Sequence, residues 1–205
     1  MRGNVYIVSA PSGSGKSTLV HRILNTFKSL TFSISFTTRA PRGGEKNGVE
    51  YNFVDRKAFQ EMIERGELLE WAEYHGHLYG TGREFVENHV RSGRDVILDI
   101  DVQGARQVRS KFNQTISVFI LPPSFPELER RLRARQLEPE ETIRKRLEIA
   151  HREILCYRDY DYVIINDVLE ESLETLQSIL RAGQFRAQNQ EERIQGIMAS
   201  FGGST

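Results

Sequence analysis

The stretch APSGSGKST, residues 10–18, decides the fold of this chain. It follows a short β-branched and aromatic run at 5–9 and precedes apolar residues at helical spacing over 17–27. Closely spaced glycines let consecutive backbone N–H groups point into one concavity, and the start of the helix adds the positive end of its dipole. This order of strand, glycine-rich turn and helix predicts a phosphate-binding loop.

In such a loop Lys16 reaches the β- and γ-phosphates of a nucleotide, and the Ser17 hydroxyl is a ligand of Mg²⁺. The pattern G-x-x-x-x-G-K-[ST] departs at its first position, where Ala10 stands in place of glycine. Alanine fits there if its φ is negative. A Ser/Gly turn with a chance lysine is the competing interpretation, and it leaves the flanking strand and helix unexplained. The predicted ATP-binding residues of the loop are Ala10, Pro11, Ser12, Gly13, Ser14, Gly15, Lys16, Ser17 and Thr18.

Strand and helix patterns alternate at both ends of the chain. The run DVILDID at 95–101 is continuously apolar with acids at its end, which is typical of a buried parallel strand. The alternation predicts an α/β fold whose parallel sheet core is covered by helices on both faces. Further strands are expected at 116–121 and 162–165, and further helices at 103–111, after Ser124, at 138–157 and at 169–181.

Residues 32–90 interrupt this alternation and are richer in strands and short connections, so we expect an insertion. Thr81 with Glu84 three residues later resembles a capping box that opens a helix to about residue 91. The other elements expected in the insertion are strands at 32–36, near 51–54 and at 68–74, and a helix at 57–65.

Two acids close the strand at 95–101. Asp99 and Asp101 are two residues apart, so on a strand their side chains share one face, near the edge where such sheets bind ligands. We expect Asp99 to organise Mg²⁺ through water. A carboxylate pair for acid–base hydrolysis fits poorly beside a phosphate-binding loop, and strand-end acids facing solvent are the remaining interpretation.

The charge of the 205-residue chain is balanced, with 28 Lys and Arg against 28 Asp and Glu. Neutrality argues against a protein that coats nucleic acid. The balance is a cancellation, because residues 1–50, 51–101, 102–150 and 151–205 carry +5, −5, +4 and −4. Cys156 is the single cysteine, which excludes an intramolecular disulfide and favours a cytoplasmic protein. No apolar stretch approaches the length of a membrane span, and nothing in the apolar pattern distinguishes a monomer from a homo-oligomer.

Two further segments indicate a phosphorylated acceptor. Arg39 and Arg42 lie in a glycine-rich connection at 33–53 where each guanidinium can bind a phosphate bidentately, and Tyr51 completes an anion clamp. In LLEWAEYHGHLYGTG, residues 68–82, Glu70 is followed by the hydroxyls of Tyr79 and Thr81. One carboxylate can accept both adjacent donors of guanine, a pair that adenine lacks.

With these motifs the chain resembles the bacterial-type guanylate kinases, which are P-loop nucleoside monophosphate kinases. The resemblance covers about residues 4–182 and rests on the phosphate loop, the segments 33–53 and 68–82, DIDVQGA at 99–105 and the arginine-rich stretch 130–146. It implies a five-stranded parallel P-loop core (1–31, 91–121 and 151–205), a mixed α/β GMP-binding insertion (32–90) and a helical lid (122–150). It implies ATP-dependent phosphorylation of GMP, and of dGMP as well, to the diphosphate, with Mg²⁺ bound as Mg·ATP.

The resemblance also implies residue roles. Glu70 and Asp101 would contact the base, and the arginines and tyrosines the phosphate. Asn166 falls where the family contacts the adenine of ATP. The implied GMP-binding residues are Ser35, Arg39, Arg42, Tyr51, Glu70, Tyr79, Thr81 and Asp101.

The attacking group in this reaction is a phosphate oxygen that is already anionic, because the second pKa of a phosphate monoester is about 6. No general base is therefore expected. The transition state needs cations instead, and we expect them from Lys16, Arg39 and the lid. Arg131 and Arg135 are at i and i+4 on one helical face, and Arg146 can approach from the next helix. A solvated, salt-bridged helix pair is the competing interpretation of this stretch.

Two other functions stay open at this stage. One is a guanylate-kinase-like interaction module with little catalysis, against which the intact Lys16 and Ser17 argue. The other is a related P-loop kinase with a different phosphorylated acceptor, against which Glu70 and Asp101 argue.

Overall fold

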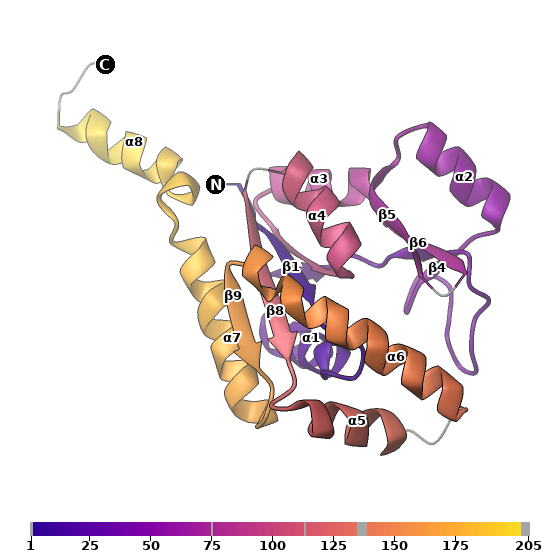
Figure 1. Ribbon diagram of the computed structural model, residues 1–205. Coiled ribbons are helices and arrows are strands. Elements are labelled where there is room, and N and C mark those ends of the chain that lie inside the picture. Colours follow the sequence, from indigo (N-terminus) through magenta and orange to yellow (C-terminus); the bar gives the residue numbers. More distant parts are fainter. Residues whose placement is uncertain (1, 75, 113, 135–138, 202–205) are drawn as a thin grey trace.

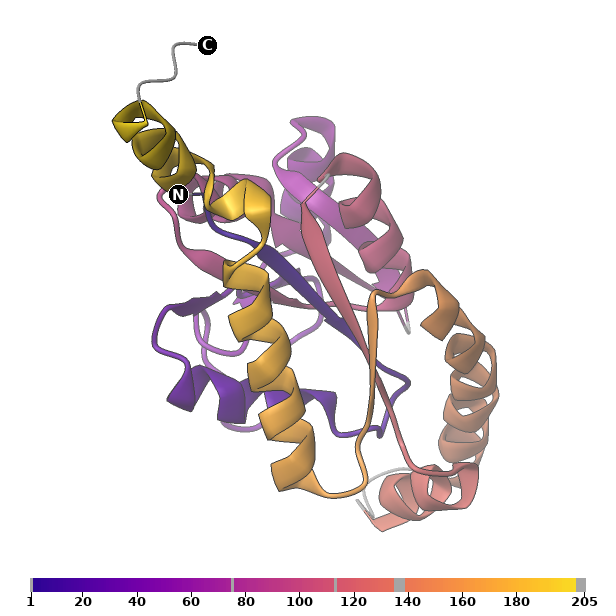
Figure 2. The ribbon, with the colours of Figure 1, turned by 90° about the vertical axis from the view of Figure 1, so that its left-hand side faces the viewer.

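A five-stranded sheet forms the centre of the computed structural model, which describes residues 2–74, 76–112, 114–134 and 139–201 (Figures 1 and 2). All neighbouring strands are parallel, in the order β2-β7-β1-β8-β9. This arrangement confirms the predicted fold class. The strands are β1 (Val5–Ser9), β2 (Leu30–Phe32), β7 (Asp95–Asp99), β8 (Thr115–Leu121) and β9 (Tyr162–Ile165).

Helices cover both faces of this sheet, α1 (Lys16–Thr26) and α7 (Leu169–Gln184) on one side and α3 (Arg83–Arg91) and α4 (Val102–Lys111) on the other. A hydrophobic core lies on each face of the sheet, and successive residues of β1 pack into the two cores alternately. Tyr6 and Val8 pack with α1 and α7, whereas Val5 and Ile7 pack with α3 and α4. Burial on both faces explains why the central strands are continuously apolar.

A second, smaller sheet has the order β4-β3-β6-β5. It consists of β3 (Phe36–Thr37), β4 (Asn52–Phe53), β5 (Leu68–Tyr74) and β6 (His77–Gly82), and α2 (Arg56–Glu64) packs on it through the buried Phe59. The expected single strand at 32–36 is wrong. The chain leaves the first sheet after β2 and enters the second at β3, so the two halves of that run pair with different strands.

Two local predictions around the second sheet are also wrong. Thr81 does not cap a helix, because it lies in β6 and its hydroxyl donates to Glu70; α3 begins after Gly82 with no side-chain cap. Asp101 does not lie on a strand with Asp99. It is the N-cap of α4, and its Oδ1 accepts the Gly104 N–H at 2.8 Å. The buried carboxylate of Glu70 therefore binds the Thr81 hydroxyl, and the start of α4 is capped by the Asp101 side chain, although local patterns assigned both residues elsewhere.

The helices α5 (Phe125–Ala134) and α6 (Glu140–Glu153) pack on each other through Leu128, Leu132, Ile143 and Ala150. The expected helix at 138–157 ends earlier, at Glu153, and continues as a 3-10 turn, η1 (Ile154–Asp159). After α7 come two elements that the sequence did not predict, the short η2 (Ala187–Asn189) and α8 (Glu191–Ser200), which extends away from the body of the molecule (Figure 1).

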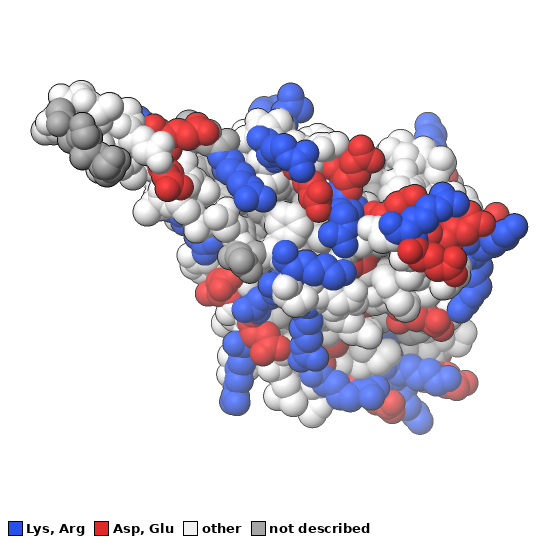
Figure 3. Space-filling view, turned by 90° about the horizontal axis from the view of Figure 1, so that it is seen from above, with Lys and Arg blue, Asp and Glu red and all other residues white. Residues whose placement is uncertain are grey.

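The surface carries charges of both signs side by side on the face seen in Figure 3. The charge blocks of the sequence therefore do not form surfaces of a single sign on that face. Within the described residues, no helix is both long and apolar enough to cross a membrane.

Asp95 ties the start of β7 to both ends of the chain, and its removal should destabilise the fold. Its carboxylate is 6% exposed and accepts the backbone and side-chain N–H groups of Asn4 at 2.7 and 2.9 Å and the Gln184 amide at 3.1 Å. Asp95→Ala leaves the buried donors of Asn4 and the half-buried amide of Gln184 without this acceptor, so we expect a loss of about 3 kcal/mol in the free energy of unfolding, measured by urea denaturation. The exposed control Asp167→Ala should stay within about 0.5 kcal/mol of the parent chain. Equal denaturation midpoints for the two variants would contradict this role.

Candidate active site

A cavity of about 330 Å³ lies between the loop at 10–18 and the second sheet. It is continuous from the start of α1 to the strands β5 and β6. The predicted nucleotide loop therefore shares one space with five of the predicted acceptor residues, namely Ser35, Tyr51, Glu70, Tyr79 and Asp101, whereas Arg39, Arg42 and Thr81 are outside its lining. The residues that line it are Ala10, Pro11, Ser12, Gly13, Ser14, Gly15, Lys16, Ser17, Thr18, Ser35, Tyr51, Glu70, Ala72, Tyr74, Tyr79, Asp99, Ile100, Asp101 and Glu153.

The loop has the geometry expected of an anion site. Gly13 and Gly15 adopt φ of 94° and 90°, values that favour glycine, and Gly15 is the N-cap of α1. Lys16 is the first helical residue, and its ammonium forms an ion pair with Asp99 and donates to the carbonyl of Ile100 at 3.3 Å. Asp99 thus holds the lysine beside the start of the helix, where the helix dipole also attracts a phosphate.

Ser17 and Asp99 face each other in the same corner. The Ser17 Oγ lies 3.5 Å from the Asp99 Oδ2. A hydroxyl and a carboxylate are oxygen ligands of the kind that Mg²⁺ prefers, and Mg²⁺ in kinases is bound by one or two such groups together with phosphates and water. The described residues contain no group of three or more His, Cys, Asp or Glu side chains placed to hold a metal.

Asn166 supports the loop from behind. Its side chain is 4% exposed, and its amide donates to the Ser14 carbonyl at 2.8 Å. A methyl group at Gly15 would overlap that amide, so the glycine permits the contact. The backbone carbonyl of Asn166 accepts from Arg131 at 3.1 Å. Asn166 therefore joins the phosphate loop to α5, and a contact with adenine stays a prediction.

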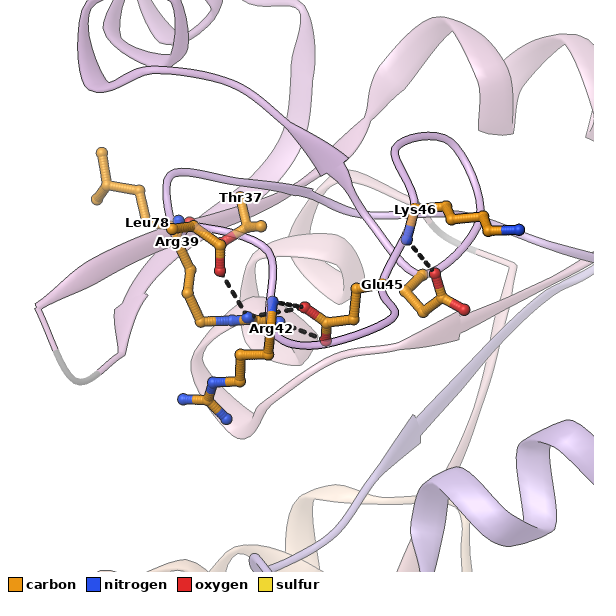
Figure 4. A network of polar contacts seen from close by, with 8 residues as sticks. Thr37, Arg39, Arg42, Glu45, Lys46 and Leu78 are labelled. Carbon is orange, nitrogen blue, oxygen red and sulfur yellow. Dashed lines mark hydrogen bonds and ion pairs between the residues drawn. The ribbon is translucent and has the colours of Figure 1, made fainter.

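Arg39 is fixed by a carboxylate that the sequence interpretation missed. Its two terminal nitrogens donate to the two oxygens of Glu45 at 2.9 and 2.8 Å, and Nη1 also donates to the Ala40 carbonyl at 2.8 Å (Figure 4). The backbone N–H of Arg42 donates to the same carboxylate at 2.7 Å. The hydrogen bond to Glu45 raises the pKa of Arg39, which keeps the buried guanidinium charged.

Aromatic rings complete this part of the site. The Arg39 guanidinium lies over the Tyr51 ring at 5.3 Å from its centroid, and Tyr51 meets Tyr79 edge-on at 5.9 Å. Tyr51, Tyr79 and Ser35 present hydroxyls to the cavity, whereas Arg42 lies exposed outside its lining. Arg39 is not in the lining either, and it borders the cavity through its contact with the Tyr51 ring. The structure therefore places three hydroxyl-bearing side chains in the lining and a fixed cation beside one of them.

Glu70 is the buried acid of the cavity. Only 4% of it is exposed, and its Oε1 accepts the Thr81 hydroxyl at 2.6 Å. Its pKa is raised to about 7, chiefly because the carboxyl group is buried; the hydrogen bond from Thr81 opposes this shift, and the charge of Asp101 adds to it. A carboxylate that is held in this way and also lines the cavity can accept hydrogen bonds from a bound group.

The two predicted lid cations in the described part of the chain, Arg131 and Arg146, do not line the cavity. Arg131 donates to Glu127 at 2.7 Å, and Arg146 lies on α6. Arg135 falls outside the described residues. The neighbouring Arg130 and Arg133 form ion pairs with acids of α5 and α6, as expected for a salt-bridged helix surface.

Three cavity or clamp residues with polar side chains, Glu45, Tyr74 and Glu153, were not predicted from the sequence, and neither were the apolar lining residues Ala72 and Ile100. The signal for Glu45 was present, since it is the first acid in an otherwise basic loop, but its partner is six residues away in an irregular turn. Glu153 ends α6, and burial raises its pKa to about 7, with a contribution from Asp101. Glu153 is far in sequence from the phosphate loop and from the acceptor residues, so no local sequence pattern connects it with the site.

Comparisons with known proteins agree with this geometry. The family model described as guanylate kinase matches residues 2–183. The chain is 50% identical over 182 residues to a guanylate kinase of Dechloromonas aromatica, covering 89% of this chain and 90% of the relative, and 40% identical over 195 residues to one of Thermotoga maritima, covering 95% and 94%. The crystal structure of guanylate kinase from Anaplasma phagocytophilum superposes with a TM-score of 0.77 at 35% identity, covering 94% of this chain and 96% of that one.

Proposed function

The chain belongs to the guanylate kinase family, and from that premise we propose which of its residues carry out each part of the reaction. The protein is an ATP:GMP phosphotransferase, which converts ATP and GMP to ADP and GDP. The observation that carries the assignment of residues is the single cavity with Lys16 at one end and the buried Glu70 at the other. One end suits a phosphate chain, and the other suits a base with adjacent N–H donors.

On the donor side, we assign the phosphates of ATP to the loop at 10–18. Lys16 would exchange its partner Asp99 for phosphate oxygens, because a triphosphate offers more negative charge at the helix start than one carboxylate does. Ser17, with Asp99 through water, would hold Mg²⁺. When bound, Mg²⁺ neutralises charge on the transferring phosphoryl group.

On the acceptor side, we assign the phosphate of GMP to Arg39, Arg42 and the hydroxyls of Ser35, Tyr51 and Tyr79. The base is assigned to Glu70, Thr81 and Asp101. The ionised Glu70 can accept from both N1–H and the 2-amino group of guanine, while the Thr81 hydroxyl, which already donates to it, fixes its orientation. The same contacts are available to dGMP, since none of these assignments involves the ribose.

No side chain is needed to remove a proton from the nucleophile. The second pKa of the GMP phosphate is about 6, so an α-phosphate oxygen is already anionic at neutral pH. The work of the protein is therefore to align that oxygen with the γ-phosphorus and to surround it with cations.

We propose that α5 and the part of α6 up to residue 150 form the lid (residues 122–150), over a core of 1–31, 91–121 and 151–205 and an acceptor region of 32–90. Arg131 and Arg146 would then reach the cavity only after the lid moves, because they are outside its lining. We assign Arg135 to the same group of transition-state cations. Closure would also exclude water, which protects ATP from hydrolysis. We place this activity in the cytoplasm, where its nucleotide substrates are made and used.

A coupled ADP-release assay over a panel of nucleoside monophosphates tests the base assignment. We expect GMP and dGMP to be phosphorylated well and AMP, CMP and UMP poorly. Glu70→Gln should raise KM for GMP about tenfold or more and reduce the preference for guanine, because an amide cannot accept from both donors. Lys16→Ala is the contrasting variant and should lower kcat with every acceptor. Unchanged base preference in Glu70→Gln would refute the assignment of Glu70, and no turnover with any acceptor would favour a binding module.

Glu45 should position Arg39 for the acceptor phosphate. Glu45→Gln keeps the size of the side chain but removes the charged, bidentate contact, so we expect kcat/KM for GMP to fall about tenfold while KM for ATP is unchanged. Glu50→Gln is the matched control, because Glu50 lies in the same loop and accepts only a backbone bond from Lys46 among the contacts described. A rise in kcat/KM in Glu45→Gln would mean that Glu45 competes with the phosphate instead of positioning its receptor.

The affinity for GMP should depend on pH through Glu70. Its pKa is about 7 in the ligand-free protein, and only the ionised form accepts both guanine donors, so KM for GMP should rise as the pH falls from 8 to 6. The GMP phosphate titrates near pH 6 and adds its own step. The Glu70→Gln variant should keep the step of the phosphate and lose the one near pH 7. Identical pH profiles of KM for the two proteins would show that Glu70 does not titrate on binding.

A further inference from the structure

Helix α4 holds the outer edge of β5 through side chains. β5 is the last strand of the second sheet, so within the described part of the chain no strand pairs with its outer backbone groups. The Gln107 amide donates to the Trp71 carbonyl at 2.6 Å and accepts from the Trp71 N–H at 3.3 Å, and the Lys111 ammonium donates to the Leu69 carbonyl at 2.6 Å. Glu70, the residue between these two, is thereby fixed in its position relative to α4.

Gly104 lies on the same face of α4, three residues before Gln107. A Cβ atom built at Gly104 would lie 3.0 Å from the Glu70 Cδ and would overlap its Oε2. Gly104 is not among the glycines with positive φ, so the backbone conformation does not require glycine there. Glycine is also less favourable than alanine inside a helix. The requirement at this position is therefore space for one carboxylate oxygen.

The opposite side of the same carboxylate is also held. The Thr81 hydroxyl, on β6, donates to Oε1 at 2.6 Å. The side chain is almost fully buried, so a group added at Gly104 could move Oε2 only by turning the carboxylate or pushing it into the cavity that it lines. Because the carboxylate is the far end of a flexible side chain, its movement should change the free energy of unfolding little. It changes where the acceptor oxygens lie.

We propose that Gly104 is a specificity-determining position for the acceptor base. Because Gly104 has no side chain, the Glu70 carboxylate can lie close to α4, in the space that a Cβ atom would fill. This position aligns its two oxygens with the two adjacent donors of guanine. The inference rests on the proposed function, in which Glu70 accepts from N1–H and from the 2-amino group. Gly104 touches no substrate in this account and acts as a positioning residue through Glu70.

The test is Gly104→Ala, assayed with GMP, with inosine monophosphate, which lacks the 2-amino group, and with ATP. Since a bidentate contact gives roughly ten- to hundredfold discrimination, we expect KM for GMP to rise at least about tenfold. The preference for GMP over inosine monophosphate should fall by a similar factor, while KM for ATP stays within about twofold. The melting temperature should not fall, because alanine favours the helix.

The matched control is Gly196→Ala, the same change inside α8, where an added Cβ would meet no described atom within 4 Å apart from its chain neighbours and the backbone of its own helix. It should leave all three KM values unchanged. A second variant separates displacement from misfolding. In the Glu70→Asp variant the side chain is one methylene shorter, so its carboxylate should no longer reach Gly104. Adding Gly104→Ala to that variant should therefore change KM for GMP less than about threefold.

Two results would overturn the inference. One is a Gly104→Ala enzyme with parental KM and parental base preference. The other is an equal loss toward GMP, inosine monophosphate and ATP, which would indicate general damage to the site. Both differ from a failure of the proposed function, in which Glu70→Gln itself would leave the preference for guanine intact.

Discussion

The parallel pairing of β1 with β7 places Val8 opposite Asp99, and the rest of the site is arranged around this register. The phosphate loop leaves β1 one residue after Ser9, so Lys16 at its end comes within reach of the acid that ends β7. From β7 the chain turns directly into α4, whose side chains Gln107 and Lys111 bind the backbone of β5. One pair of neighbouring strands thus fixes the donor end of the cavity directly and the acceptor end through a helix.

The parts of this arrangement that the sequence predicted are those with a local physical cause. The loop at 10–18 requires glycines with positive φ, a lysine and the start of a helix in a fixed order, and each of these requirements can be recognised from residue types in the sequence. The central strands are buried on both faces and therefore read as continuous apolar runs. Family membership and the phosphotransferase activity followed from several such segments in the same order, and the comparisons confirm both.

The predictions that were wrong concern residues whose partners are distant in sequence. Thr81 and Glu84 satisfy the pattern of a capping box, but the buried Glu70 needs the hydroxyl of Thr81 more than a solvated helix start does. Asp101 extends an apolar run in the sequence, yet it caps α4 because the chain turns after β7. Gly104 carries no pattern at all, since it is defined by one contact made across the fold, and Glu45 pairs with Arg39 through an irregular turn that no periodic pattern describes.

The pairing of Arg39 with Glu45 also affects how a charged substrate approaches. Because the carboxylate already neutralises the buried guanidinium, an incoming GMP dianion meets little net field from that pair at a distance. Long-range steering falls instead to exposed cations such as Arg42, whose pull is screened within about 8 Å at physiological ionic strength. Arg39 acts only on contact, so capture of the nucleotide is separated from its orientation, and salt would slow the first step much more than the second.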